Sequence, residues 1–390
     1  MIQRRTVFYL GLSQLVCWGI SYYLIGGFGE RIAEDLGWGL PLVHGGFSAA
    51  LLVMGLSSPI TGWLIDRYGG ARVMTLGSGL IALGCSGLAL SHSLPAYYAA
   101  WLFLGLGMRL TLYDAAFAAL ARIAGPEAGG PIAQITLLGG LASTVFWPIG
   151  NFLAEALGWR GAVFVYAGVA LLTVPLHMAI PAGRFQRPPS TPEDPPPPSR
   201  SDERLAGALY AAIAMLTSFL NSGMSAHMIG ILAGLGLATS LSVWIATLRG
   251  IGQSAARLSG VLFGGRIPPL TLNLVAASAL PVCFIAGLFS GGWVAAAVAF
   301  AFIYGAGNGI ITITRGTMPL VLFDNRRYGA ITGKLLVPGF LLSALAPLAY
   351  ALVIEHLGPE AALAMSVGAA VVTLIASVAL FSRFGRQRQR

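Results

Sequence analysis

Long apolar segments, separated by short polar connections, fill most of the chain. A helix needs about 20 consecutive apolar residues to cross the hydrocarbon core of a bilayer, and twelve segments of this kind can be distinguished. They do not alternate polar and apolar positions with a period of two, as membrane-spanning β-strands do. The pattern therefore predicts an all-α polytopic membrane protein with twelve transmembrane helices. The predicted helices span residues 7–29, 41–65, 72–91, 96–121, 132–157, 162–181, 205–232, 237–264, 271–290, 293–322, 331–355 and 360–382.

The composition supports lipid as the main environment. Of 390 residues, 56% are hydrophobic and 9% are charged, whereas roughly a quarter of the residues of an ordinary soluble domain are charged. A soluble protein with this composition would have too little polar surface to stay in solution.

The sequence predicts no cofactor, no metal and no enzymatic activity. Cys17, Cys85 and Cys283 lie in separate apolar segments without a C-x-x-C pair, so no disulfide framework is expected. The five histidines form no ligand cluster, and no nucleophile–base pair can be identified. The phosphate-binding motif G-x-x-x-x-G-K-[ST] is absent, because Lys334 is followed by Leu335. Direct use of ATP is therefore not expected.

The net charge of +9 reflects membrane topology and does not indicate a nucleic-acid partner. The basic residues concentrate at the N-terminus, in every second loop and at the C-terminal end, which by the positive-inside rule makes both termini cytoplasmic. The preference for arginine over lysine is typical of a GC-rich bacterial genome, so we expect the cell (inner) membrane. The basic residues in these segments are Arg4, Arg5, Arg67, Arg72, Arg122, Arg184, Arg187, Arg200, Arg204, Arg266, Arg326, Arg327, Arg383, Arg386, Arg388 and Arg390.

A segment rich in proline and charge divides the predicted helices into six and six. It reads GRFQRPPSTPEDPPPPSRSDER and covers residues 183–204. Such a composition cannot bury apolar area and is typical of an extended linker. We expect an N-terminal bundle at 1–182, a cytoplasmic linker at 183–204 and a C-terminal bundle at 205–390.

The two halves carry similar segments at a constant offset of 200 residues. FLAEALG at 152–158 matches LVIEHLG at 352–358, and GLG at 105–107 matches GAG at 305–307. Each match is short, but the shared offset indicates a duplicated six-helix unit. In transporters built from such repeats, substrate sites lie near the middle of the membrane.

The segment GWLIDRYGGAR, at residues 62–72, places two charges between long apolar segments. It resembles the loop between helices 2 and 3 of the major facilitator superfamily, where a G-x-x-x-D-R-x-G core is followed by basic residues. Gly62, Asp66, Arg67 and Gly69 fit the core, and Arg72 is the trailing base. With the twelve spans and the central linker, the resemblance covers essentially the whole chain.

Two departures from the family pattern are visible. Gly70 and Ala71 stand where a further basic residue is common, and the second-half counterpart, GVLFGGRIPP at 260–269, lacks the aspartate and keeps Arg266.

The resemblance implies two six-helix pseudo-symmetric bundles and a gating role for the loop. In the family this loop is understood to latch the two halves in the outward-open state. Asp66 and Arg67 would then act in a gate, outside the substrate site. Alternatively, they only cap helices and set topology.

Few charged residues remain inside the predicted spans. An arginine in hydrocarbon costs at least a few kcal/mol unless it faces a polar cavity or a partner. The charged residues inside the spans are therefore candidates for function. Arg249, Gln253 and Arg257 follow at steps of four and share one stripe of a helix. The segment GIGQSAARLSG, at 250–260, is similar to helix 8 of the monocarboxylate and oxalate/formate branches, where an arginine near this position contacts the carboxylate substrate. Those carriers often have an aspartate where this chain has Gln253. A structural ion pair, for example between Arg257 and Asp114, is the alternative.

Further polar residues are candidates in other spans. Asn308 and Arg315 lie on one face of the predicted tenth helix, and this face either lines a cavity or packs against another helix. Lys334 follows a Tyr-Gly, as a helix-11 lysine does at the anion in oxalate/formate-type carriers, or else it snorkels to the interface. Asp114 either carries a coupling proton or neutralises an arginine such as Arg109.

Together these features favour a secondary transporter working by alternating access. The expected cargo is a small organic anion, a monocarboxylate or dicarboxylate, driven by proton coupling or exchange (symport or antiport). One alternative is an efflux permease for drugs or a metalloid such as arsenite, and another is a membrane receptor that transports nothing. The expected partners are the substrate, protons and the lipid bilayer, and we expect a monomer.

Overall fold

The computed structural model describes residues 2–186, 199–263 and 267–385, and all regular secondary structure in these residues is helical. Each of the twelve predicted spans is helical over most of its described length, which confirms the all-α prediction. Residues 187–198 of the predicted linker, together with Arg266 and the C-terminal arginines from 386 on, lie outside the described residues.

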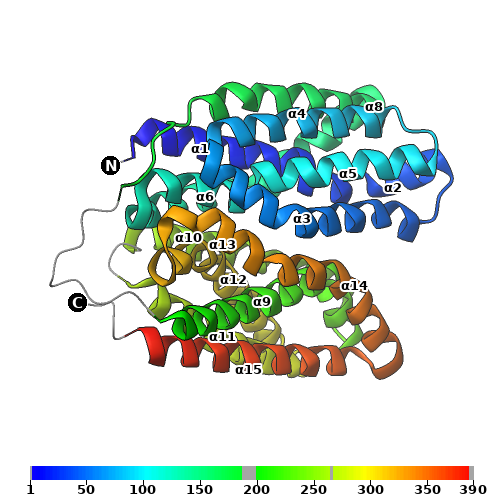
Figure 1. The fold of residues 1–390 in the computed structure, drawn as a ribbon. Coiled ribbons are helices and arrows are strands. Elements are labelled where there is room, and N and C mark those ends of the chain that lie inside the picture. The colour runs from blue at the N-terminus through cyan, green and yellow to red at the C-terminus, as the bar shows by residue number, and fades with distance from the viewer. Residues whose placement is uncertain (1, 187–198, 264–266, 386–390) are drawn as a thin grey trace. The chain divides into compact units, whose positions relative to one another are not determined.

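The helices fall into two compact units. The first comprises Met1–Phe185 and Asp324–Val337, and the second comprises Gln186–Phe323 and Pro338–Arg390. The helices of the first unit are α1 (Arg4–Cys17), the π-helix η1 (Trp18–Tyr22), α2 (Leu24–Leu36), α3 (Leu40–Tyr68), α4 (Gly70–Ala89), α5 (Leu94–Thr111), α6 (Tyr113–Ala124), η2 (Gly125–Ala128), α7 (Gly129–Gly139), α8 (Ala142–Met178), η3 (Asn325–Arg327) and α13 (Tyr328–Leu335) (Figure 1). Those of the second unit are α9 (Arg200–Gly234), α10 (Thr239–Phe263), α11 (Pro269–Leu288), α12 (Val294–Leu322), α14 (Val337–Leu357) and α15 (Pro359–Phe384).

Some predicted spans consist of more than one helix, and in one case two predicted spans share a single helix. The first span consists of α1, η1 and α2, and the fourth of α5 and α6, which are separated at Leu112. Conversely, α8 contains most of the fifth span and most of the sixth, and Gly158, with a φ of 70°, turns the chain between them. In the described residues, nine helical runs are long and apolar enough to cross a membrane. One of them, Leu94–Met178, contains the fourth and fifth predicted spans and most of the sixth. The run α10 is not among the nine, since Arg249, Gln253 and Arg257 make it less apolar.

The glycines at an offset of 200 behave alike in the two units. Gly158 and Gly358 both have a left-handed φ, 70° and 87°, and each is followed by the last long helix of its unit. A Cβ on Gly105 would lie 2.6 Å from the carbonyl oxygen of Ala50, and one on Gly305 would lie 2.0 Å from a carbonyl oxygen of α10. In both units, glycine thus lets one helix approach the backbone of another closely.

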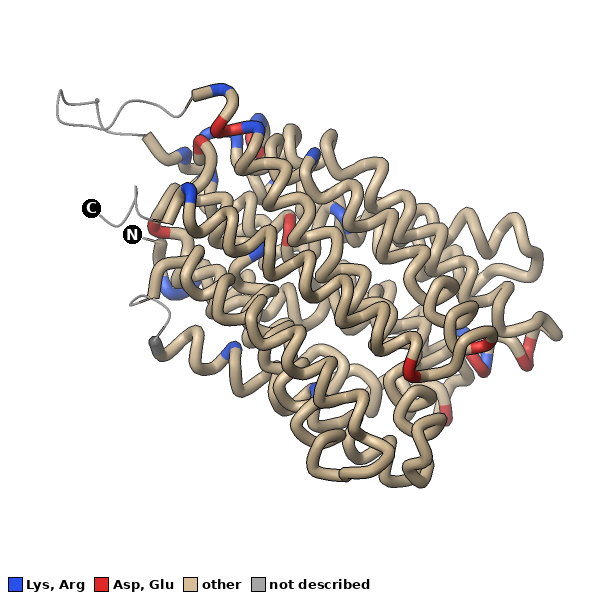
Figure 2. The backbone as a smooth tube through the Cα atoms, turned by 90° about the horizontal axis from the view of Figure 1, so that it is seen from below, with Lys and Arg blue, Asp and Glu red and all other residues tan. Residues whose placement is uncertain are grey.

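Each unit has its own core of large rings and aliphatic side chains. Tyr97 and Trp101 are fully buried in the first unit, and Phe284, Phe300 and Tyr350 are fully buried in the second. The charged residues lie mainly near the helix ends, and long stretches of helix between carry none (Figure 2). The exceptions in mid-helix are the candidates for a functional site.

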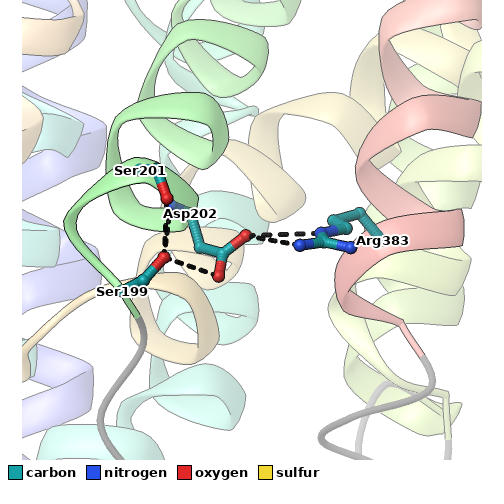
Figure 3. A network of polar contacts seen from close by, with 4 residues as sticks. All are labelled: Ser199, Ser201, Asp202 and Arg383. Carbon is teal, nitrogen blue, oxygen red and sulfur yellow. Dashed lines mark hydrogen bonds and ion pairs between the residues drawn. The ribbon is translucent and has the colours of Figure 1, made fainter.

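A polar network connects the beginning of α9 to the end of α15 in the second unit (Figure 3). Ser199 caps α9 by accepting a hydrogen bond from the amide of Asp202 at 3.1 Å. Arg383, in the last turn of α15, donates to Asp202 Oδ1 through Nη2 at 3.0 Å and through Nε at 3.3 Å. The network joins the first helix of this unit to its last.

Candidate functional site

The clearest polar cluster within a span of the second unit surrounds Arg249 of α10. Its Nη2 donates to Asn221 Oδ1 at 2.7 Å and to Ser225 Oγ at 2.9 Å, both on α9. Its guanidinium carbon lies 5.3 Å from the ring centroid of Tyr304 on α12, a cation–π arrangement. Three helices therefore hold one half-buried arginine side chain.

Asn308 joins the same cluster. Its Nδ2 donates to Asn221 Oδ1 at 2.9 Å, so this oxygen accepts hydrogen bonds from both Arg249 and Asn308. The backbone oxygen of Asn308 accepts from Thr312 Oγ1 at 2.9 Å. The structure thus brings together two predicted site residues through Asn221, which sequence reasoning missed.

Close packing of α10 on α12 fixes the position of this cluster. A Cβ on Gly305 would lie 2.0 Å from the backbone oxygen of Arg249, and one on Gly309 would lie 2.6 Å from that of Gln253. Because both neighbours are backbone atoms, neither can move aside cheaply. The side chain of Gln253 is half-buried and forms no hydrogen bond within the described part of the chain.

The described partners of Arg249 are all neutral. Among the residues that the structure describes, its contacts are two amide or hydroxyl oxygens and one phenol ring, and no carboxylate lies within ion-pair distance. A guanidinium in a span usually faces a cavity or pairs with an acid. Its planar fork of donors suits a carboxylate, so this arrangement can accept an anion.

Two other predicted arginines lie on the same pair of helices. Arg257, two turns beyond Arg249 on α10, is only 5% exposed. Arg315 of α12 is half-buried, and its backbone oxygen accepts a hydrogen bond from Tyr210 Oη at 2.8 Å.

Three other predicted site residues, Arg109, Asp114 and Lys334, belong to the first unit. Arg109 of α5 is 2% exposed, and its Nη2 donates to Ser58 Oγ at 2.9 Å. Asp114 is half-buried in the first turn of α6. Lys334 lies in the last turn of α13 and is exposed.

Asp66 binds the beginning of α13. This carboxylate is 9% exposed, and its Oδ1 accepts from the amide of Gly329 at 3.0 Å while Oδ2 accepts from the amide of Ala330 at 2.7 Å. A carboxylate at a helix N-terminus satisfies free amides and interacts favourably with the helix dipole. Gly62 lets the two segments meet, because a Cβ there would lie 1.8 Å from the oxygen of Gly329.

The basic residues of the same motif point elsewhere. Arg67 and Arg72 are exposed, and the Arg67 guanidinium lies 5.2 Å from the ring of Trp63 and 5.4 Å from that of Tyr68. Arg122 does contact the aspartate, since its Nε donates to the Asp66 backbone oxygen at 3.2 Å. Sequence reasoning counted Arg122 only as a topology signal.

The fold and these motifs define a multi-pass membrane transporter. The model of the Major Facilitator Superfamily matches residues 10–337, and the chain belongs to this superfamily. Its members are transporters and not enzymes.

Relatives of this chain include carriers of carboxylates. Mouse monocarboxylate transporter 11 is 27% identical over 222 residues, which are 53% of this chain and 46% of that protein. The oxalate:formate antiporter of Oxalobacter formigenes is 26% identical over 167 residues, 42% of this chain and 39% of the antiporter. The chain therefore spans less than half the length of these relatives.

Solved structures confirm the fold. The proton:xylose symporter XylE, bound to 6-bromo-6-deoxy-D-glucose, superposes with a TM-score of 0.75 over 97% of this chain and 95% of its own, at 11% identity. Identity this low supports the fold alone.

Proposed function

We propose that this protein is a secondary transporter that moves a small organic anion, a monocarboxylate or dicarboxylate, across the cell (inner) membrane by alternating access. Proton coupling or exchange would drive the movement, and both termini would be cytoplasmic. The chain would work as a monomer.

The observation that carries the proposal is the neutral surroundings of Arg249. Its described partners, Asn221, Ser225 and Tyr304, orient the guanidinium without neutralising it. A positive charge held this way has no counter-charge among the residues that the structure describes, and a substrate carboxylate can supply one through two parallel N–H···O bonds.

Each predicted site residue has a role in this proposal. Arg249 binds the carboxylate, and Asn308 orients Asn221 and supplies a donor. Gln253 and Arg257 continue the same stripe of α10, and Arg315 is a further cationic candidate for a second carboxylate group. Lys334, in the first unit, is a separate candidate for the substrate. Asp114 and Arg109 are the candidates for proton coupling or charge balance.

The names of the relatives agree with an anionic cargo. A monocarboxylate transporter and an oxalate:formate antiporter both carry carboxylates by name. They support the substrate class, and the choice among carboxylates depends on this chain's own side chains.

Counterflow of a labelled carboxylate in proteoliposomes tests the proposal. Arg249→Gln should lower the transport efficiency, kcat/KM, at least about a hundredfold, because it removes charged hydrogen bonds of roughly 1.5–3 kcal/mol each. Arg249→Lys should retain part of the activity, since it keeps the charge and loses the fork. Arg383→Gln removes an exposed arginine that pairs with Asp202 and is the matched control. Equal counterflow by Arg249→Gln and Arg383→Gln would refute the anion site.

A further inference from the structure

The chain folds back onto the first unit directly after α8. This helix ends at Met178, and residues 180–185, here named the strap, lead from it into the predicted linker. Ile180 is 3% exposed, and a Cβ on Gly70 of α4 would lie 3.8 Å from its Cγ2 atom. The strap belongs to the first unit, and with it residues 183–185, which begin the predicted linker.

Arg122, in the last turn of α6, fastens the strap. Its Nη1 donates to the backbone oxygens of Ala182 at 3.1 Å and Gly183 at 2.8 Å. The backbone oxygen of Arg122 accepts a hydrogen bond from the amide of Phe185 at 2.6 Å. A Cβ on Gly125 would lie 2.6 Å from the ring of Phe185, so this ring packs directly on the glycine. Hydrogen bonds and a ring thus hold the strap against the end of α6.

The same guanidinium also binds the end of α3. Its Nε donates to the backbone oxygen of Asp66 at 3.2 Å, and a Cβ on Gly69 would lie 3.4 Å from its Nη1. The charges of Arg122 and of Arg184, which is part of the strap, both attract the Asp66 carboxylate. The two arginines also repel one another. Their proximity is therefore favourable beside this carboxylate and unfavourable without it.

Asp66 continues the connection to α13. Its carboxylate accepts hydrogen bonds from the amides of Gly329 and Ala330, in the first turn of that helix. The first amides of a helix have no partner within the helix, so the protection of these two depends on Asp66. The strap, Arg122, Asp66 and α13 thus form one connected series inside the first unit.

We infer that the strap is a regulatory arm of the predicted gate: release of residues 180–185 from α6 weakens the contact between Asp66 and α13. Because the strap leads into the linker, the conformation of the linker controls how long this contact lasts. Coupling between two contacts is reciprocal, so loss of the Asp66 carboxylate must also loosen the strap. The inference concerns gating and does not depend on which cargo is carried.

Hydrogen exchange of the full-length protein in lipid nanodiscs, measured by mass spectrometry, tests the inference. Phe185→Ala removes the ring from Gly125 and touches neither Asp66 nor α13. The amide at position 185, corrected for its intrinsic rate, should exchange about tenfold faster, because exchange follows local opening. The amides of Gly329 and Ala330 should exchange at least about fivefold faster through the coupling. Phe185→Leu keeps an apolar side chain and should retain most of the protection at both places.

Asp66→Asn tests the coupling in the opposite direction. It removes no hydrogen bond of the Phe185 amide, but Arg122 and Arg184 then lack the carboxylate that offsets their repulsion. The Phe185 amide should therefore exchange at least about fivefold faster. Gln186→Ala is the matched control, since Gln186 is exposed and adjacent to Phe185. It should leave the exchange of both reporters unchanged.

Three results would overturn the inference. In Phe185→Ala, one is faster exchange at position 185 with unchanged exchange at Gly329 and Ala330, and another is unchanged exchange at position 185. The third is an unchanged Phe185 amide in Asp66→Asn, which decides the matter alone if Phe185→Ala does not fold as judged by size-exclusion chromatography. Failure to transport any carboxylate would refute the proposed function and leave this inference standing.

Discussion

Asp66→Asn is the substitution that isolates the contact between α3 and the beginning of α13. The two carboxylate oxygens accept one amide each, from Gly329 at 3.0 Å and from Ala330 at 2.7 Å. Asparagine has nearly the same shape but keeps only one acceptor, and its NH₂ group would face the second amide. The contact should therefore weaken without loss of the fold.

The magnitude follows from these two hydrogen bonds. Each bond to a charged acceptor is worth roughly 1.5–3 kcal/mol, and a neutral one about 1 kcal/mol. Replacing two charged bonds by one neutral bond should remove at least about 2 kcal/mol from the conformation in which α13 is bound. That energy changes the ratio of the two gating states by roughly thirtyfold.

Paired spin labels measure this ratio directly. Cys17, Cys85 and Cys283 are fully buried, so cysteines introduced at the exposed positions Arg72 and Arg383 should label selectively. The distance distribution in Asp66→Asn should shift away from the state that dominates in the wild type. Substrate binding should survive, because Asp66 lies outside the candidate anion site.

Arg67→Gln is the control for this experiment. Arg67 is adjacent in sequence, but it is exposed and packs on Trp63 and Tyr68. It should keep the wild-type distribution. A distribution in Asp66→Asn that matches the wild type would refute the latch.

Three further predictions concern the second unit. Gly305→Ala should lower the melting temperature and destabilise the unit by about 1–3 kcal/mol, because the added Cβ would meet the backbone of Arg249. Gly368→Ala is the control and should be neutral or slightly stabilising, because nothing lies within 4 Å of a Cβ there. Equal effects of the two substitutions would contradict the packing argument. Ser199→Ala should cost about 1 kcal/mol by removing the cap of α9. Arg383→Gln should lower the melting temperature only slightly and only at low salt, because salt screens an exposed pair such as that with Asp202. Thermal unfolding at two salt concentrations checks both substitutions. A large, salt-independent loss in Arg383→Gln would contradict the reasoning.

The helical architecture could be predicted from the sequence because hydropathy reports directly on burial in lipid. The similarity of the two halves at an offset of 200 residues could also be read from the sequence. Two glycine pairs, Gly105 with Gly305 and Gly158 with Gly358, have matching structural roles in the two units. These glycines fix close helix contacts and turns, so their spacing carries structural information that neighbouring apolar residues do not.

The interruptions at Trp18, Leu112 and Gly140 could not be predicted in the same way. The apolar segments continue through them, and Leu112 is neither proline nor glycine. The break there is stabilised by Gln14, whose amide binds the carbonyl of Thr111 from 97 positions away. A contact so distant in sequence leaves no local pattern.

The candidate site was predicted in part. Arg249 and Asn308 were named from their position in apolar spans, and the structure joins them through Asn221. Asn221 and Ser225 lie four residues apart in an apolar segment, a spacing that could have marked them. The assignment of Arg249, Gln253, Arg257, Asn308, Arg315 and Lys334 to the substrate stays a prediction.

Uptake of a substrate panel under imposed pH gradients of both signs tests the central claim most directly. The panel should contain monocarboxylates, dicarboxylates, a cationic drug and arsenite, with the wild-type protein in sealed proteoliposomes. The account predicts that at least one carboxylate accumulates inside the vesicles and that reversing the gradient, or replacing it with an opposing anion, changes its direction. Movement of arsenite or the drug without any carboxylate, or binding of a carboxylate that never crosses, would contradict it.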